Sequence, residues 1–148
     1  YKAFEILEKA ILTENYENLA LGSLIDGLGF GNCSTTLGHA LSYVFSNEGI
    51  NHGHALAFTT TVSHKFNNSI FYDRFKKLVK KMNFDKVFLK QNLDEASKTI
   101  LLDKKHLDNN PKNISQKDII LLLKKINNEQ VFDWVFWLKN SLKIYYVK

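Results

Sequence analysis

Helical spacing of the apolar residues is the strongest constraint that this sequence sets on its fold. Only one Pro and seven Gly interrupt the 148 residues, and no alternating strand pattern of useful length occurs. Pro is the residue least compatible with a helix interior, and apolar residues three and four apart line one face of a helix. The chain is therefore predicted to be all-α, a single multi-helix bundle over residues 1–148.

Apolar stripes and the turn residues between them place the expected helices. These cover residues 1–12, 16–30, about 34–45, 52–66, 70–82, 89–102, 115–126 and a last segment that holds Val131, Trp134, Val135, Trp137 and Leu138. Ser115 and Asp118 have the spacing of a capping box, with Asp in place of Glu. Gly49 can take positive φ in the turn before residue 52. The main loop is expected over residues 106–113.

Glycines are concentrated in the second expected helix, at Gly22, Gly27 and Gly29. Each Gly weakens an isolated helix by up to about 1 kcal/mol relative to Ala. Three of them in one helix predict close approach of another helix or of a ligand. Residues 1–12 already have a helical pattern without a Met or an N-cap before them, so the chain is expected to begin inside a larger protein.

Composition argues against several classes of protein. The single Cys33 excludes an intramolecular disulfide framework and a Cys-based zinc site. No run approaches the ~20 apolar residues that a membrane helix requires. The net charge of +5 comes mostly from lysines scattered among Asn and Asp, while the aromatic residues recur beside aliphatic ones. This pattern favours a solvated surface over a nucleic-acid interface, and a cytoplasmic protein is expected.

Three of the five histidines fall within residues 39–54, around a predicted turn. His39 lies in the helix before the turn, and His52 opens the helix after it. Two antiparallel helices joined by a short turn bring such positions together, and an imidazole from each can bind a divalent metal. Imidazole suits iron and zinc alike. Taken alone, however, the pair is more typical of buried or capping histidines, and two ligands do not complete a metal's shell.

A longer string around these histidines carries a family resemblance. It reads Gly-His-Ala-Leu-Ser-Tyr at 38–43, Asn-His-Gly-His-Ala-Leu-Ala at 51–57 and Phe-Asn at 66–67. The string resembles the metal-binding stretch of the iron-containing alcohol dehydrogenases, a superfamily that includes 3-dehydroquinate synthase. It is most similar to the phosphonoacetaldehyde-reductase-like branch. The preceding Leu-Ile-Asp-Gly-Leu-Gly at 24–29 also resembles the family's glycine-bearing helix, and beyond residue 67 only the helical character agrees.

The resemblance implies the C-terminal helical domain of a two-domain enzyme. Its N-terminal α/β domain would bind NAD(P), and the metal would lie in the cleft between the domains. The implied activity is hydride transfer between the nicotinamide and an alcohol or aldehyde substrate. The chain lacks the Gly-Gly-Gly-Ser phosphate loop of the nucleotide-binding domain. It is therefore expected to need that domain as a partner and to be inactive alone, and the whole enzyme could be a homodimer.

The resemblance also assigns roles to individual residues. His39 and His52 match the later two of the family's metal ligands, whereas the earlier Asp-x-x-x-His pair does not precede them here. Their separation is one residue shorter than is usual, Asn51 replaces a Pro, and Tyr43 stands where many members have a second His. Tyr43 is one helical turn past His39, so it is the candidate for proton movement or substrate orientation. A core tyrosine is the alternative.

The remaining histidines are not expected to bind the metal. His54 lies about 200° around the helix from His52 and is expected to be structural or on the substrate side. His64 and His106 are expected to be surface or loop residues without a role in the site.

Two other functions stay open at this point. One is a dehydroquinate-synthase-like carbon–oxygen lyase, which would want a basic substrate-binding set beside the metal histidines. The other is a helical remnant without enzymatic activity that binds a partner through the surface once covered by the nucleotide-binding domain.

Overall fold

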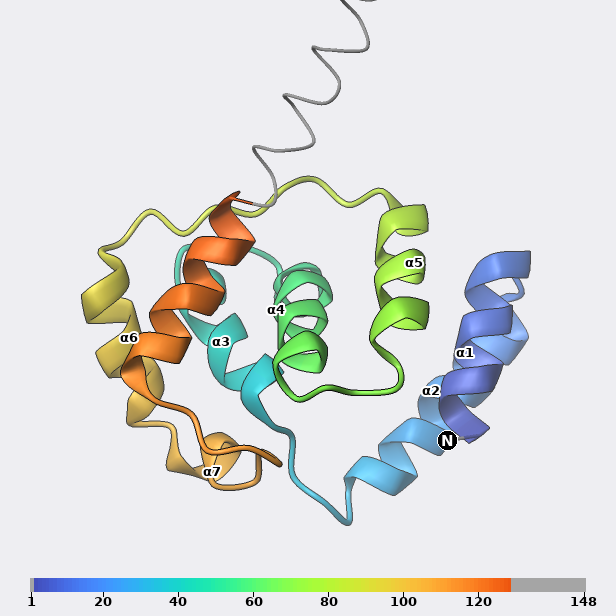
Figure 1. Ribbon diagram of the computed structural model, residues 1–148. Helices are drawn as coiled ribbons and strands as arrows, with labels where there is room; N and C mark the ends of the chain where they lie inside the picture. The colour runs from blue at the N-terminus through green and yellow to red at the C-terminus, as the bar shows by residue number, and fades with distance from the viewer. Residues whose placement is uncertain (1, 129–148) are drawn as a thin grey trace, which may run out of the picture.

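The computed structural model describes residues 2–128, and these fold entirely as helices and connecting segments (Figure 1). The labelled helices are α1 (Lys2–Thr13), α2 (Tyr16–Phe30), α3 (Leu37–Ser46), α4 (His52–Phe66), α5 (Tyr72–Met82), α6 (Leu93–Leu101) and α7 (Lys104–Leu107). A further helix covers residues 116–128. No strand occurs in this part of the chain, which confirms the predicted all-α class. The expected last helix around Trp134 lies outside the described residues.

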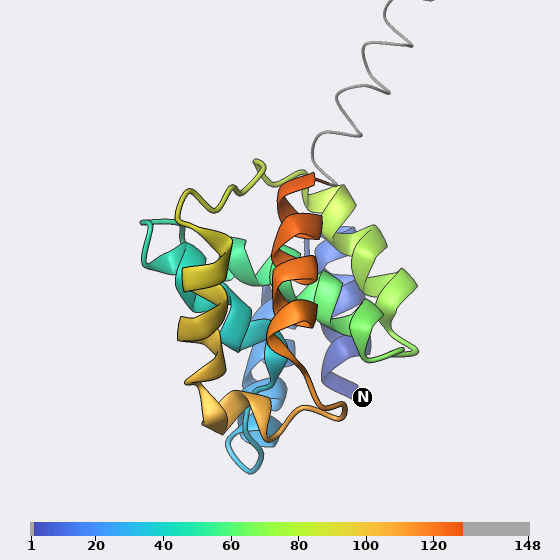
Figure 2. The same cartoon turned by 60° about the vertical axis from the view of Figure 1, so that its left-hand side comes forward.

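The core forms around α3 and α4, which pack against each other at the centre of the bundle (Figure 1). Buried side chains of α6 and of the 116–128 helix belong to the same hydrophobic cluster as those of α3. Figure 2 shows these helices from another direction. The fully buried large side chains of this cluster are Phe45, Leu37, Leu41, Ile100, Ile119 and Leu123. Each contributes roughly 1.5–3 kcal/mol by leaving water, so this cluster supplies much of the stability that holds α3 in place.

The hairpin of α1 and α2 lies at one side of the bundle, next to α5 (Figure 1). Arg74 of α5 forms an ion pair with Glu8 of α1. A Cβ atom on Gly22 would lie 2.8 Å from the Leu7 side chain, so the close approach predicted from the glycines is confirmed there. Gly27 and Gly29 face open space.

Helix α2 is exposed over most of its surface. Its large exposed apolar residues are Tyr16, Leu21, Leu24, Leu28 and Phe30. None of the described helices is long and apolar enough to cross a membrane.

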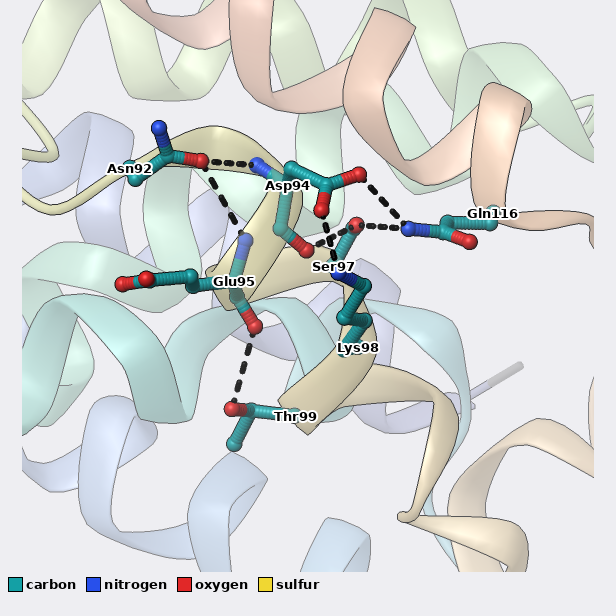
Figure 3. Close-up of polar contacts among 7 residues, drawn as sticks. All are labelled: Asn92, Asp94, Glu95, Ser97, Lys98, Thr99 and Gln116. Carbon is teal, nitrogen blue, oxygen red and sulfur yellow. Dashed lines mark hydrogen bonds and ion pairs between the residues drawn. The ribbon is translucent and has the colours of Figure 1, made fainter.

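Helix α6 begins at Leu93 instead of the predicted Leu89. Figure 3 shows the reason at its first turn, where the side chain of Asn92 accepts hydrogen bonds from the backbone N–H groups of Asp94 and Glu95 at 2.8 and 3.3 Å. An Asn in this position is a strong helix start signal. Gln116 also donates to Asp94 and to the Ser97 hydroxyl at 3.0 Å each (Figure 3), which joins α6 to the 116–128 helix.

The predicted capping box at the start of the 116–128 helix is confirmed. The carboxylate of Asp118 accepts from the backbone N–H of Ser115 at 2.9 Å, and the Ser115 hydroxyl accepts from the Asp118 N–H at 3.3 Å. The hydrogen bonds from Ser115 hold the pKa of Asp118 below its ordinary value.

Candidate metal centre

Helix α3 is buried on every side except one stripe, and that stripe carries the candidate site residues. His39, Tyr43 and Ser46 are its residues that retain exposure, at positions i, i+4 and i+7, while the residues between them are buried. Positions with this spacing lie above one another on one helix face. The core therefore fixes the backbone of α3 and leaves only the histidine-bearing face open.

A tight turn brings His52 back toward this stripe. Gly49 adopts φ +88°, as predicted. The carboxylate of Glu48 accepts hydrogen bonds from the backbone N–H groups of Lys90 and Gln91 at 2.9–3.0 Å. Burial acts to raise the pKa of Glu48, but these hydrogen bonds hold it below its ordinary value. Asn51 precedes α4 without a side-chain cap, so the turn is fixed by Gly49 and Glu48.

The imidazoles of His39 and His52 face each other across this hairpin. Their ring centroids lie 5.6 Å apart with an interplanar angle of 61°. Two imidazoles bound to one ion through metal–nitrogen bonds of about 2.0–2.1 Å have centroids roughly 5 Å apart. The observed separation of the two rings is close to this value.

Serine hydroxyls on α3 contact the ring of His52. Ser42 Oγ and Ser46 Oγ each lie 3.4 Å from His52 Nδ1. The Ser42 hydroxyl donates its own proton to the His39 carbonyl at 2.8 Å, so its oxygen is free to accept from Nδ1–H. A proton on Nδ1 leaves the Nε2 lone pair of His52 available to a metal, since the partner of one ring nitrogen decides which nitrogen ligates.

His106 also lies in this cluster, so its expected place as a surface or loop residue was wrong. It lies in α7, is only 8% exposed, and its ring is parallel to that of His39 with centroids 6.0 Å apart. Asp103 accepts from His106 Nδ1 at 2.6 Å. The Asp-x-x-His spacing at 103–106 is the sequence signal that could have indicated a paired histidine.

The aromatic ring of Tyr43 completes the cluster. Its centroid lies 5.7 Å from that of His52, nearly parallel to it, and 5.6 Å from that of His106. At 42% exposure the side chain is not a core tyrosine. The structure therefore places Tyr43 beside both histidines, with part of its surface open to solvent.

His54 and His64 lie elsewhere. His54 Nε2 is hydrogen-bonded to the Asp85 carbonyl, and its ring packs on Phe58 and Phe84. His64 packs its ring on Phe75 of α5. Residues 2–128 contain no group of three or more His, Cys, Asp or Glu side chains placed to hold a metal. This part of the chain thus offers a pair of imidazoles, which is half of a metal's usual shell.

The electrostatic environment favours neutral imidazole at His39. Burial lowers the pKa of His39, the neighbouring His52 and His106 lower it further, and Asp103 acts in the opposite direction. A metal binds the neutral form of imidazole, so a lowered pKa makes His39 a ready ligand near pH 7.

An open hollow of about 440 Å³ lies next to α7. Its lining consists of Phe30 at the end of α2, residues 31–35 of the loop that follows, and Lys105, the neighbour of His106. The end of α2 therefore lies near the segment that carries His106.

The fold and this cluster together define an all-helical domain with a pair of imidazoles on one open helix face. The model of the Fe-containing alcohol dehydrogenase family, C-terminal, matches residues 4–101, which is well over half of the chain. The chain belongs to this family. No curated protein and no solved structure matches it.

Two histidines should make the metal-free fold sensitive to acid. Burial lowers the pKa of His64 as it does that of His39. As pH falls through the ordinary histidine pKa of about 6.5, the unfolded chain then binds more protons than the folded one. We expect the free energy of unfolding, measured with urea, to fall between about pH 7 and about pH 5. His64→Gln should weaken this dependence, and an identical pH profile for the variant would contradict the role of His64.

Proposed function

We propose that this chain is the metal-binding C-terminal part of an NAD(P)-dependent alcohol dehydrogenase or aldehyde reductase. The observation that carries the proposal is the pair of facing imidazoles, His39 and His52, on the open stripe of a domain of this family. They would hold a divalent metal, iron or zinc. Similarity of residues 38–57 to the phosphonoacetaldehyde-reductase-like branch supports that branch within the family.

The chemistry divides between the metal and the residues around it. When bound, the metal would act as a Lewis acid on the oxygen of the substrate. His39 and His52 would hold it from the helical side, and the serine hydroxyls beside His52 Nδ1 would leave Nε2 as the ligating nitrogen. Tyr43, stacked on His52 and partly exposed, is placed to orient the substrate or to carry a proton to its oxygen.

A second domain would have to bind the nucleotide. We propose that an N-terminal nucleotide-binding domain covers the exposed apolar residues of α2 and the open stripe of α3. Exposed apolar patches of several hundred Å² mark such interfaces. The metal's remaining ligands would lie outside residues 2–128, and the 148-residue chain alone would not turn over a substrate. The cytoplasm remains the proposed location, since a single Cys suits a reducing compartment.

Zinc binding to the 148-residue chain tests this proposal. We expect weak binding by titration calorimetry, because only two protein ligands come from the described residues. His39→Ala and His52→Ala should each lower the affinity by more than the roughly 10- to 100-fold that loss of an outer-shell partner costs. His54→Ala is the matched control and should bind as the wild type does. If His54→Ala abolishes binding while the other two variants keep it, the ligand assignment is wrong.

A further inference from the structure

The pairing of His106 with Asp103 is not used by the two-ligand site. Both carboxylate oxygens of Asp103 lie close to His106 Nδ1, at 2.6 and 2.7 Å. A carboxylate can only accept, so Nδ1 carries the proton and donates it. Asp103 also accepts from the backbone N–H of His106 at 3.4 Å, at the start of α7. The orientation of this ring is therefore fixed through both its backbone and its side chain.

The other ring nitrogen of His106 has no partner in the part of the chain that the structure describes. Its Nε2 has no hydrogen-bond partner among residues 2–128, although the side chain as a whole is buried. Asp103 therefore holds one edge of the His106 ring, and no polar group of residues 2–128 holds the other.

His106 lies beside the residues of the proposed metal site. Its ring is parallel to that of His39 to within 9°, and its centroid lies 5.6 Å from that of Tyr43. His106 does not make a third ligand in this arrangement, because no three such side chains converge among the described residues. What it can do is restrict the orientation of the ring beside it.

We propose that His106, held by Asp103, is a positioning residue that orients the imidazole of His39 for metal binding. The proposal rests on the proposed function, since the ion is the one bound by His39 and His52. Outer-shell partners that hydrogen-bond to a ligating histidine are worth about 10- to 100-fold in metal affinity. His106 lies beside His39 as a parallel ring and makes no hydrogen bond to it, so an effect at the lower end of that range is expected. Without His106, the His39 ring could rotate more freely and would lose more conformational entropy when it binds a metal, which lowers the affinity.

Zinc calorimetry on variants of the 148-residue chain tests the proposal. We expect His106→Ala and Asp103→Ala to weaken zinc binding by about tenfold. Asp103→Asn should bind within about threefold of the wild type, because the amide oxygen can still accept from Nδ1–H. His64→Ala is the matched control, since His64 packs on Phe75 away from the cluster, and it should leave zinc affinity unchanged. Far-UV circular dichroism of each variant checks that its helices remain.

A spectroscopic readout separates positioning from a merely structural role. At saturating Co²⁺, the visible absorption bands should shift in His106→Ala and Asp103→Ala and stay unchanged in Asp103→Asn. If His106→Ala does not fold, the two Asp103 variants carry the test. Unchanged zinc affinity or unchanged cobalt bands overturn the role of His106 and leave the proposed function standing, provided that His39→Ala and His52→Ala lose binding. A wild-type chain that binds no zinc overturns both.

Discussion

Replacing Phe45 with alanine should lower the free energy of unfolding by about 3–5 kcal/mol, because its side chain is fully buried at the centre of the core. The cost combines the lost transfer of the ring from water with the cavity left behind. The backbone carbonyl of Phe45 accepts hydrogen bonds from the N–H groups of Glu48 and Ile50, so Phe45 also lies at the start of the turn that leads to His52. We expect the midpoint temperature to fall by roughly 10 °C or more, and urea unfolding measures the free energy directly.

Phe88 provides the matched control for this substitution. It lies in the segment between α5 and α6 and is 48% exposed. Phe88→Ala removes the same atoms but should cost less than about 1 kcal/mol, since much of the ring is already in water. Equal destabilisation by the two substitutions would show that α3 is not the centre of the core.

Helix content could be predicted from the sequence because it depends on local spacing. The stripes of apolar residues and the scarcity of Pro predicted every labelled helix except α7. The predicted start of α6 at Leu89 was wrong for a physical reason. The backbone N–H of Leu89 donates to the Asn127 side chain at 3.1 Å, and that of Lys90 donates to Glu48. These partners lie far away in sequence, so the segment is held in a non-helical form that no local pattern indicates.

For the candidate site, the sequence predicted that His39 and His52 lie close together but not that His106 lies beside them. His39 and His52 lie on either side of one hairpin, and their surroundings match the string of a family to which the chain belongs. His106 is far from both in sequence and reaches them only because α7 packs against α3. Its local sequence, Asp-Lys-Lys-His at 103–106, is polar and short, which is typical of a loop. The apolar packing of α3, and not the spacing of the histidines, decides that His106 joins the cluster.

The contact between α3 and α4 depends on Gly38, the residue before His39. A Cβ atom at this position would lie 2.9 Å from Thr60 Oγ1 and 3.2 Å from the Thr60 Cα atom. The hydroxyl could rotate away, but the backbone of Thr60 could not move without displacing α4. Gly38 is thus required for the distance between the two helices that carry His39 and His52.

Gly38→Val should therefore affect both stability and the metal site. We expect a loss of about 2–3 kcal/mol in the free energy of unfolding, typical of overpacking in a tight core. Because α3 must shift relative to α4, the two imidazoles should separate, and zinc affinity should fall by about tenfold or more. Urea unfolding and calorimetry measure the two effects.

Gly27→Val is the matched control, since Gly27 is also helical but has nothing within 4 Å of an added Cβ. Valine and glycine differ little in helix propensity, so this substitution should change stability by less than about 1 kcal/mol and leave zinc affinity unchanged. A Gly38→Val chain that is destabilised yet binds zinc as tightly as the wild type would mean that the spacing of α3 and α4 does not set the site. In that case the two histidines would converge through side-chain rotation alone, and the packing of Gly38 on Thr60 would serve only the core.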